Sequence, residues 1–320
     1  MAIHTVHQPQ KHHVWDNSIP PVITIKSGDT VHFDCIDASN GSIQPTTIAS
    51  DLAKCDLSTF DPAQGPVFVE GAEPGYVLQV DILELETADW GWSAVFPGFG
   101  VLTDEFDAEA PAIKIWKLDR EAMCAWFDEE RTIRVPLRPF CGVVGVARGL
   151  QGQFSTIPPY NTGGNIDTRH VTTGSTLFLP VEVKGALFSC GDGHAAQGDG
   201  EVCGTAIETL MKTKFRLTVR KDRPYTKTPH FRTPPVPGAD KEEYYCTTGV
   251  EDSFAKATRE AVRSMVNFLC AEKNLSRIDA YMLCSVACDL RIHEAVDIPN
   301  FVVGMMLPMS IFVGQETIGL

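Results

Sequence analysis

The stretch PVITIKSGDTVHFDC, residues 21–35, predicts a β-strand, a tight turn and a second β-strand. Its two ends are rich in β-branched and aromatic side chains, whereas Lys26 to Asp29 between them is typical of a turn. Strands at this spacing, separated by proline and glycine, indicate a β-sandwich or a partly closed barrel. The same pattern predicts further strands over residues 67–69, 77–85, 113–118, 131–137, 142–147 and 175–187.

The pattern changes near residue 250. Apolar residues between 254 and 269 recur at helical spacing behind a possible cap at Asp252 or Ser253. Residues 276–290 predict a second helix, residues 301–307 a strand, and residues 221–240 an exposed excursion. We therefore predict a strand-dominated α+β fold with two helices near the C-terminus. Residues 1–250 form a β-rich region that carries the motifs, and residues 251–320 pack on it as part of one integrated unit.

Composition and charge exclude several classes of function. The 320 residues carry a formal net charge of −14, which disfavours nucleic acid and anionic membranes as partners. No stretch is apolar and long enough to cross a bilayer, and the N-terminus lacks a secretory signal. The 10 cysteines are scattered singly, as in a reducing compartment. We expect a cytoplasmic protein.

Several common catalytic motifs are missing or broken. The sequence has neither a GxxxxGK[ST] phosphate-binding loop nor a GxSxG nucleophile elbow. His293-Glu294 begins like a zincin HExxH motif, but Asp297 replaces the second histidine, and the motif falls near a predicted helix end. Cys190 and Cys203 have acidic neighbours, which disfavour a thiolate, so we interpret both as structural.

Residues 189–208, SCGDGHAAQGDGEVCGTAIE, are the strongest candidate for a site. Asp192 and His194 are two residues apart, so on an extended chain they face the same side. Glu201 follows a Gly-Asp-Gly turn, and Glu208 lies on the next apolar segment. Carboxylates and imidazole suit zinc, manganese or iron. The alternative is ordinary turn chemistry, since Asp and Gly are common in turns.

Two other segments carry polar clusters. In residues 161–170, glycines would allow Asn165, Asp167 and His170 to converge on one site, although this segment alone favours a satisfied polar loop. In residues 35–41, a predicted strand ends in an acidic turn that contains Asp37.

The chain resembles the acetamidase/formamidase family of amidohydrolases nearly from end to end. The resemblance rests on residues 22–38 (VITIKSGDTVHFDCIDA), 65–75 (GPVFVEGAEPG), 163–167 (GGNID), 280–292 (AYMLCSVACDLRI) and above all 174–208 (GSTLFLPVEVKGALFSCGDGHAAQGDGEVCGTAIE). It implies a jelly-roll-like β-sandwich elaborated by α/β segments, a homo-oligomer, and hydrolysis of short amides such as formamide or acetamide. Some similar proteins act on small cyclic amides (γ-lactams).

The resemblance also implies a divalent metal, and we expect zinc. Asp192 and His194 are the first ligands expected, followed by Glu208, Asp37 and Asp167, with Glu201 a ligand or a general base.

Amide hydrolysis needs an activated water and a proton for the departing nitrogen, and we expect Glu201 or Glu208 to carry that proton. We expect Asn165 to orient the amide, and Trp90 and Trp92 to form either a pocket wall or core. The competing functions are a lactamase and a non-catalytic small-molecule-binding oligomer.

Overall fold

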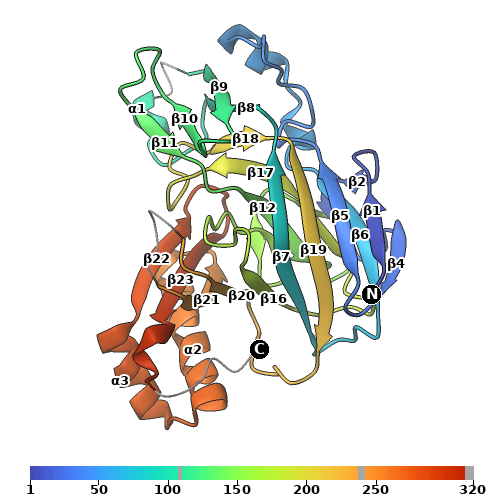
Figure 1. Cartoon of the computed structure of the whole chain (residues 1–320), viewed down its shortest axis with the longest axis vertical. Coiled ribbons are helices and arrows are strands. Elements are labelled where there is room, and N and C mark those ends of the chain that lie inside the picture. Colours follow the sequence, from blue (N-terminus) through green and yellow to red (C-terminus); the bar gives the residue numbers. More distant parts are fainter. Residues whose placement is uncertain (107–109, 237–241, 314–320) are drawn as a thin grey trace.

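The computed structural model describes residues 1–106, 110–236 and 242–313, and β-strands dominate them (Figure 1). The predicted strand-dominated α+β class is therefore confirmed. The jelly-roll connectivity stays a prediction. Among the described residues, no helix combines the length and the hydropathy that crossing a bilayer requires.

Two large sheets make up most of the described chain. The order of strands across the first sheet is β1 (Ile3–Val6), β5 (Thr30–Cys35), β19 (Met211–Arg220), β7 (Val77–Thr87), β16 (Thr176–Pro180), β20 (His230–Thr233), β21 (Tyr244–Glu251), β23 (Phe301–Pro308) and β22 (Asp289–Glu294). Only β1 pairs in parallel, with β5; the other neighbours described in this sheet are antiparallel.

The second sheet carries the candidate site. Its main path runs through β11 (Arg134–Pro136), β10 (Cys124–Trp126), β9 (Ala112–Asp119), β8 (Trp90–Val95), β18 (Ile207–Thr209), β17 (Phe188–Ala196), β12 (Phe140–Val146), β15 (Gly163–Asn165) and β14 (Pro159–Tyr160). On one side of β17, β6 (Ala63–Glu70) pairs with β17 and joins β2 (Lys11–His12) and β4 (Ile23–Lys26) to the sheet. A separate pair is formed by β3 (Val14–Trp15) and β13 (Phe154–Ser155).

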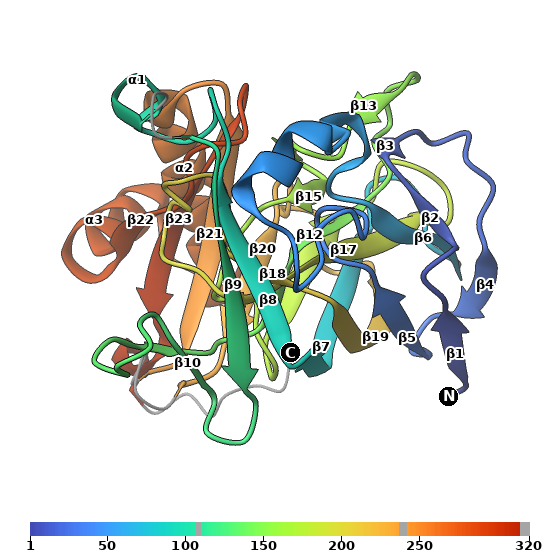
Figure 2. The ribbon, with the colours of Figure 1, turned by 90° about the horizontal axis from the view of Figure 1, so that it is seen from above.

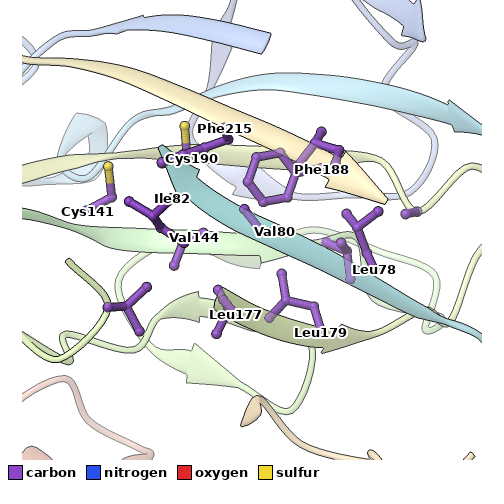
Figure 3. Packing of buried hydrophobic residues seen from close by; sticks show 14 of the residues in the cluster. Leu78, Val80, Ile82, Cys141, Val144, Leu177, Leu179, Phe188, Cys190 and Phe215 are labelled. Atoms are coloured by element: carbon purple, nitrogen blue, oxygen red, sulfur yellow. The ribbon is translucent and has the colours of Figure 1, made fainter. Parts of the chain in front are cut away.

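The main hydrophobic core lies between the two sheets. Figure 3 shows side chains of β7, β16 and β19 meeting side chains of β12 and β17. Phe33, Phe188 and Phe215 form edge-on and tilted ring contacts at its centre. Burial of this apolar surface removes it from water and supplies the main driving force for folding. The structure is thus a β-sandwich.

Three α-helices and three short 3₁₀ segments are described. The 3₁₀ segments are Ala49–Lys54, Leu57–Thr59 and Met309–Ile311, and the helices are α1 (Thr103–Phe106), α2 (Phe254–Lys273) and α3 (Arg277–Ala287). Ser253 caps α2, as the sequence predicted, because its side chain accepts a hydrogen bond from Lys256 N. Asn274 ends α2 in the left-handed conformation that such caps favour.

Helix α2 packs on the outer face of the first sheet. Alternate residues of β21 point to opposite faces, so Cys246 enters the inter-sheet core whereas Tyr245 contacts the helical layer. Tyr245 stacks on Phe268 of α2 with ring centroids 3.7 Å apart. Figure 2 shows α2 and α3 on the side of the molecule opposite the N-terminus.

Three details differ from the sequence predictions. The predicted exposed excursion over 221–240 is wrong where it contains β20, which pairs with β16 and β21; residues 237–240 lie outside the described residues. The second helix ends at Ala287, not residue 290, because β22 begins at Asp289 and pairs with β23. His293 and Glu294 are therefore in a strand rather than near a helix end.

The predicted division at residue 250 falls inside β21. This strand pairs along its length with β23, so the first sheet continues from one predicted region into the other. The division into two regions stays a prediction.

Candidate active site

The site is centred on the imidazole of His194, which is buried between two carboxylates. Its Nε2 atom lies 3.0 Å from Asp192 Oδ2 and 3.0 Å from Glu208 Oε2. A single ring N–H cannot satisfy both oxygens. The ligand atoms of all three residues lie within 4.8 Å of one another, which is the convergence expected around a shared cation.

Strand register brings these three groups together. Asp192 and His194 are alternate residues of β17, so their side chains share one face, as the sequence predicted. Glu208 lies directly opposite His194 on the antiparallel strand β18. Its Oε1 atom accepts a hydrogen bond of 2.7 Å from Ala206 N, which holds the carboxylate in place.

The alternative of ordinary turn chemistry is wrong for Gly191-Asp192-Gly193, because these residues lie inside β17. The glycines are needed for close packing instead. A Cβ atom on Gly191 would overlap Pro62 O, and one on Gly193 would overlap Met211 Cβ. Gly198 to Gly200 does lie at the following turn region, outside β17.

Gln197 fixes which nitrogen of His194 carries a proton. The Nε2 of Gln197 donates to Asp167 O over 2.7 Å, so its Oε1 faces His194 Nδ1 at 2.8 Å and accepts from it. A neutral His194 then presents the lone pair of Nε2 to Asp192 and Glu208. This is the arrangement of a metal-ligating histidine with an oriented outer partner.

A second group overlaps the first at His194. Asp167 Oδ1 lies 3.8 Å from His194 Nδ1, and Glu201 Oε1 lies 4.0 Å from Nε2. Asp167, His194 and Glu201 again bring ligand atoms within 4.8 Å of one another. The sequence therefore named all four acidic residues that surround this histidine in the two groups.

The loop that carries Glu201 is clamped to distant parts of the chain. The carboxylate of Asp199 contacts Arg169 at 3.0 Å and Arg291 at 3.3 Å, and His170 Nε2 lies 3.3 Å from it. Gly200 N donates to His293 O over 2.8 Å. His170 thus supports the loop, whereas Asp167 reaches the cluster and Asn165 lines the cavity beside it.

Four acidic residues near His194 adopt a backbone conformation that L-residues rarely take. The φ angles are 52° at Asp61, 40° at Asp167, 52° at Asp192 and 46° at Glu201. Such residues cost conformational free energy and gather at functional sites, where the surrounding structure holds them. Their concentration around one imidazole points to function rather than to a satisfied polar core.

A cavity of about 260 Å³ opens onto this cluster. One side is apolar and aromatic, with Phe60, Trp92, Phe96 and Phe99. The other side is polar, and its acidic members are Asp61, Asp192, Glu201, Glu208 and Asp297. Trp92 is therefore part of the wall, whereas Trp90 is not among the lining residues described. The volume lies below the range of drug-sized sites and suits a small ligand.

Burial and mutual repulsion shift the pKa values of the acidic groups upward. Burial has the largest effect on Glu208 and, together with the charge of Asp192, raises its pKa to about 8. The charge of His194 acts in the opposite direction. Burial raises the pKa of Asp167 to about 6. Burial and the charge of Asp167 raise the pKa of Glu201 well above its usual range. Burial alone would lower the pKa of His194, but Asp192 and Glu208 hold it well above its ordinary value.

These observations fit a divalent cation. Buried carboxylates that lie close together disfavour one another's ionisation. A cation among them would offset both the desolvation of the carboxylates and the repulsion between them. Asp192 Oδ1 is buried and has no hydrogen-bond partner among the described residues. The donor set of imidazole and carboxylates suits zinc and similar metals.

Asp37 lies outside both groups. Its carboxylate accepts hydrogen bonds from Trp92 Nε1 at 2.8 Å, Ser39 Oγ at 2.6 Å and Gly41 N at 2.9 Å. Because Trp92 forms part of the cavity wall, Asp37 supports the pocket from behind. Its role as a metal ligand stays a prediction. The next experiment distinguishes that role from support of the pocket wall.

Replacing Asp37 with Ala should leave the metal content per chain unchanged but lower the free energy of unfolding by about 1–3 kcal/mol, because buried donors lose their acceptor. Metal analysis and thermal unfolding measure the two effects. Asp34→Ala, at a half-buried position in β5, is the control. A loss of metal in Asp37→Ala alone would instead make Asp37 a ligand.

Three further residues of the site were not among the predicted ones. Asp61 and Asp297 line the cavity, and Gln197 orients His194. Asp297 was visible only as the residue that breaks the HExxH pattern. Cys190 lies in the inter-sheet core, and the thiol of Cys203 donates to Thr205 O at 3.4 Å, which agrees with structural roles.

Comparison with known proteins identifies the family. The model of the acetamidase/formamidase family matches residues 3–151 and 150–314. The chain belongs to the acetamidase/formamidase family. The resemblance found in the sequence is thereby confirmed, together with the prediction of a hydrolase acting on carbon–nitrogen bonds other than peptide bonds.

Individual acetamidase/formamidase relatives align with most of the chain. A formamidase of Methylophilus methylotrophus is 28% identical over 95% of this chain and 89% of its own length. An acetamidase of Mycolicibacterium smegmatis is 32% identical over 62% of this chain and 63% of its own length. The crystal structure of an acetamidase from Bacillus halodurans superposes with a TM-score of 0.86 at 29% identity, covering 96% of this chain and 98% of that one.

Proposed function

We propose that this family member hydrolyses short-chain primary amides, with formamide and acetamide as its substrates, to the carboxylic acid and ammonia. The observation that carries the proposal is a cavity of about 260 Å³ between an aromatic wall and an acidic cluster centred on His194. The formamidase and acetamidase relatives support the substrate class.

Asp192, His194 and Glu208 would hold a divalent metal, with Asp167 and Glu201 beside it, and we propose zinc. When bound at such a site, zinc lowers the pKa of water to about 7 and polarises a carbonyl. Gln197 keeps Nε2 of His194 available, and the β17–β18 register keeps Glu208 opposite that nitrogen.

Among the predicted proton carriers, Glu201 fits best. Both carboxylates line the cavity, but Glu208 Oε2 lies 3.0 Å from His194 Nε2, as a fellow ligand would, whereas Glu201 Oε1 lies 4.0 Å away. We assign Glu201 to accept the proton of the attacking water and to deliver it to the departing nitrogen. A positioned carboxylate of this kind contributes roughly 10²–10⁴-fold. Asn165 orients the amide.

The aromatic wall should restrict the acyl chain. Phe60, Trp92 and Phe96 leave little space beside the polar cluster, and each methylene that does not fit is worth about 1–3 kcal/mol of discrimination. A small cyclic amide is the second candidate. A structure described as a gamma lactamase from Delftia acidovorans has a TM-score of 0.67 with this chain at 25% identity, covering 97% of this chain and 93% of that one.

Ammonia release from formamide and acetamide by the purified protein tests the proposal. Activity should disappear after chelation and return with zinc, because the acidic cluster cannot generate a strong nucleophile by itself. Butyramide should react more slowly than acetamide. Activity that survives removal of all metal would refute the metal mechanism, and a metal-loaded protein that cleaves only lactams would transfer the proposal to the cyclic amides.

We also propose that the protein forms a homo-oligomer and is located in the cytoplasm. All 10 cysteines are free, which supports a reducing compartment. Exposed apolar side chains on α3, among them Ile278, Tyr281 and Val286, support an interface.

A further inference from the structure

Asn165 and Asp297 form a polar pair at the wall of the cavity. Asn165 is the last residue of β15 and is held beside Val143 of β12, whereas Asp297 follows β22 in the last part of the chain. The Nδ2 of Asn165 donates to Asp297 Oδ2 over 2.8 Å. Two segments far apart in sequence therefore meet at the cavity wall, and the bond from Asn300 Nδ2 to Pro159 O also joins them.

That bond determines the orientation of the Asn165 amide. Because Nδ2 is committed to Asp297, the oxygen Oδ1 takes the other position and can only accept. Asn165 is 4% exposed, and its Oδ1 has no hydrogen-bond partner among the described residues. A buried acceptor without a donor costs free energy that a ligand with an N–H group would recover.

The rest of the lining is also rich in acceptors and poor in available donors. Trp92 Nε1 donates to Asp37, Thr205 Oγ1 donates to Ala94 O at 2.8 Å, and His194 Nδ1 donates to Gln197. Among the described residues that line the cavity there is no lysine or arginine. With these donors committed, the side chains that line the cavity offer acceptors for the N–H groups of a ligand.

We propose that Asn165 Oδ1 and the Asp297 carboxylate form the nitrogen-binding end of the cavity and select primary amides over N-alkylated amides and esters. This inference rests on the proposed amide hydrolysis and adds the direction in which the substrate lies. The NH₂ group faces the Asn165–Asp297 pair, and the carbonyl faces the cluster of Asp192, His194 and Glu208. Sites built to bond an N–H strongly reject analogues without one.

Asp297→Asn tests the assignment, because it replaces one acceptor oxygen with an NH₂ group of similar size. We expect kcat/KM for formamide to fall by roughly 10-fold or more while kcat/KM for methyl formate changes little, since the ester has no N–H to lose. Metal content and thermal unfolding must match the wild type. Asp289→Asn, an exposed acid at the start of β22, is the matched control. Asn165→Ala replaces the test if Asp297→Asn does not fold.

Equal losses for amide and ester, with metal retained, would make Asp297 merely structural and overturn the inference. Ligand-observed NMR gives a second readout that needs no turnover: the wild type should bind formamide better than N,N-dimethylformamide, and the variant should lose this preference. A wild type that cleaves neither amides nor esters refutes the proposed function. A wild type that binds both compounds equally refutes the nitrogen-binding end.

Discussion

Replacing Asp192 with Asn should abolish binding of the proposed metal and lower the rate of formamide hydrolysis by more than about 100-fold, because the loss of even the hydrogen-bond partner of a metal ligand costs 10–100-fold. Asp192 Oδ2 lies 3.0 Å from His194 Nε2, and its other oxygen is buried without a partner among the described residues. An amide in this place has the same size but lacks the negative charge. Mass spectrometry of bound metal and ammonia release measure the two effects.

The fold should survive this substitution, because it relieves repulsion among buried carboxylates. Circular dichroism and the midpoint of thermal unfolding check this. The matched control is again Asp289→Asn, an acid-to-amide change at an exposed position. If Asp192→Asn retained the native rate and a full complement of metal, Asp192 would not be a ligand, and the assignment of the whole cluster would be wrong.

Gly142→Ala should be as damaging as the loss of a ligand, although residue 142 has no functional group. A Cβ atom there would overlap Asp192 Oδ2 and Asp167 Oδ1 and would lie 2.9 Å from His194 Cε1. The methyl group would push apart residues of both candidate metal groups. We expect loss of bound metal and a fall in kcat/KM of more than about 100-fold, by analogy with disturbed metal ligands. Metal analysis and steady-state kinetics test this.

Gly149→Ala is the control for Gly142→Ala. Its added Cβ would lie 3.2 Å from the flexible side chain of Glu182 in an exposed segment. This variant should keep both metal and activity. If Gly142→Ala bound metal normally, the carboxylates could move without cost, and the site would be less rigid than its packing indicates.

Local sequence patterns predicted those elements of the fold that residues close together in the sequence determine. Residues 30–35 form β5 as predicted, and Ser253 starts α2, because alternation and capping act within a few residues. Residues 230–233 were missed because they show neither a clear alternation nor a cap. Strand β20 forms by pairing with its neighbours β16 and β21. Pairing across long distances in sequence overrides a local impression of a proline-rich loop.

The site was predictable in the same uneven way. Asp192 and His194 follow from alternation in a strand, and Glu208 from its place on the next one. Asp37 was expected among the ligands but points to Trp92, which no spacing in the sequence reveals. Asp297 enters the cavity only because the chain returns after β22, so its place depends on tertiary structure.

The Asn165–Asp297 bond also bears on the order in which the protein is made. It joins residues 132 positions apart, so Asp297 leaves the ribosome well after Asn165. Because chains fold from the N-terminus during synthesis, the carboxylates of β17 and β18 emerge well before Asp297, to which we assigned the orientation of the substrate. A nascent chain that has reached β18 but not Asp297 therefore carries the candidate ligands Asp192, His194 and Glu208 while the cavity wall still lacks one of its carboxylates.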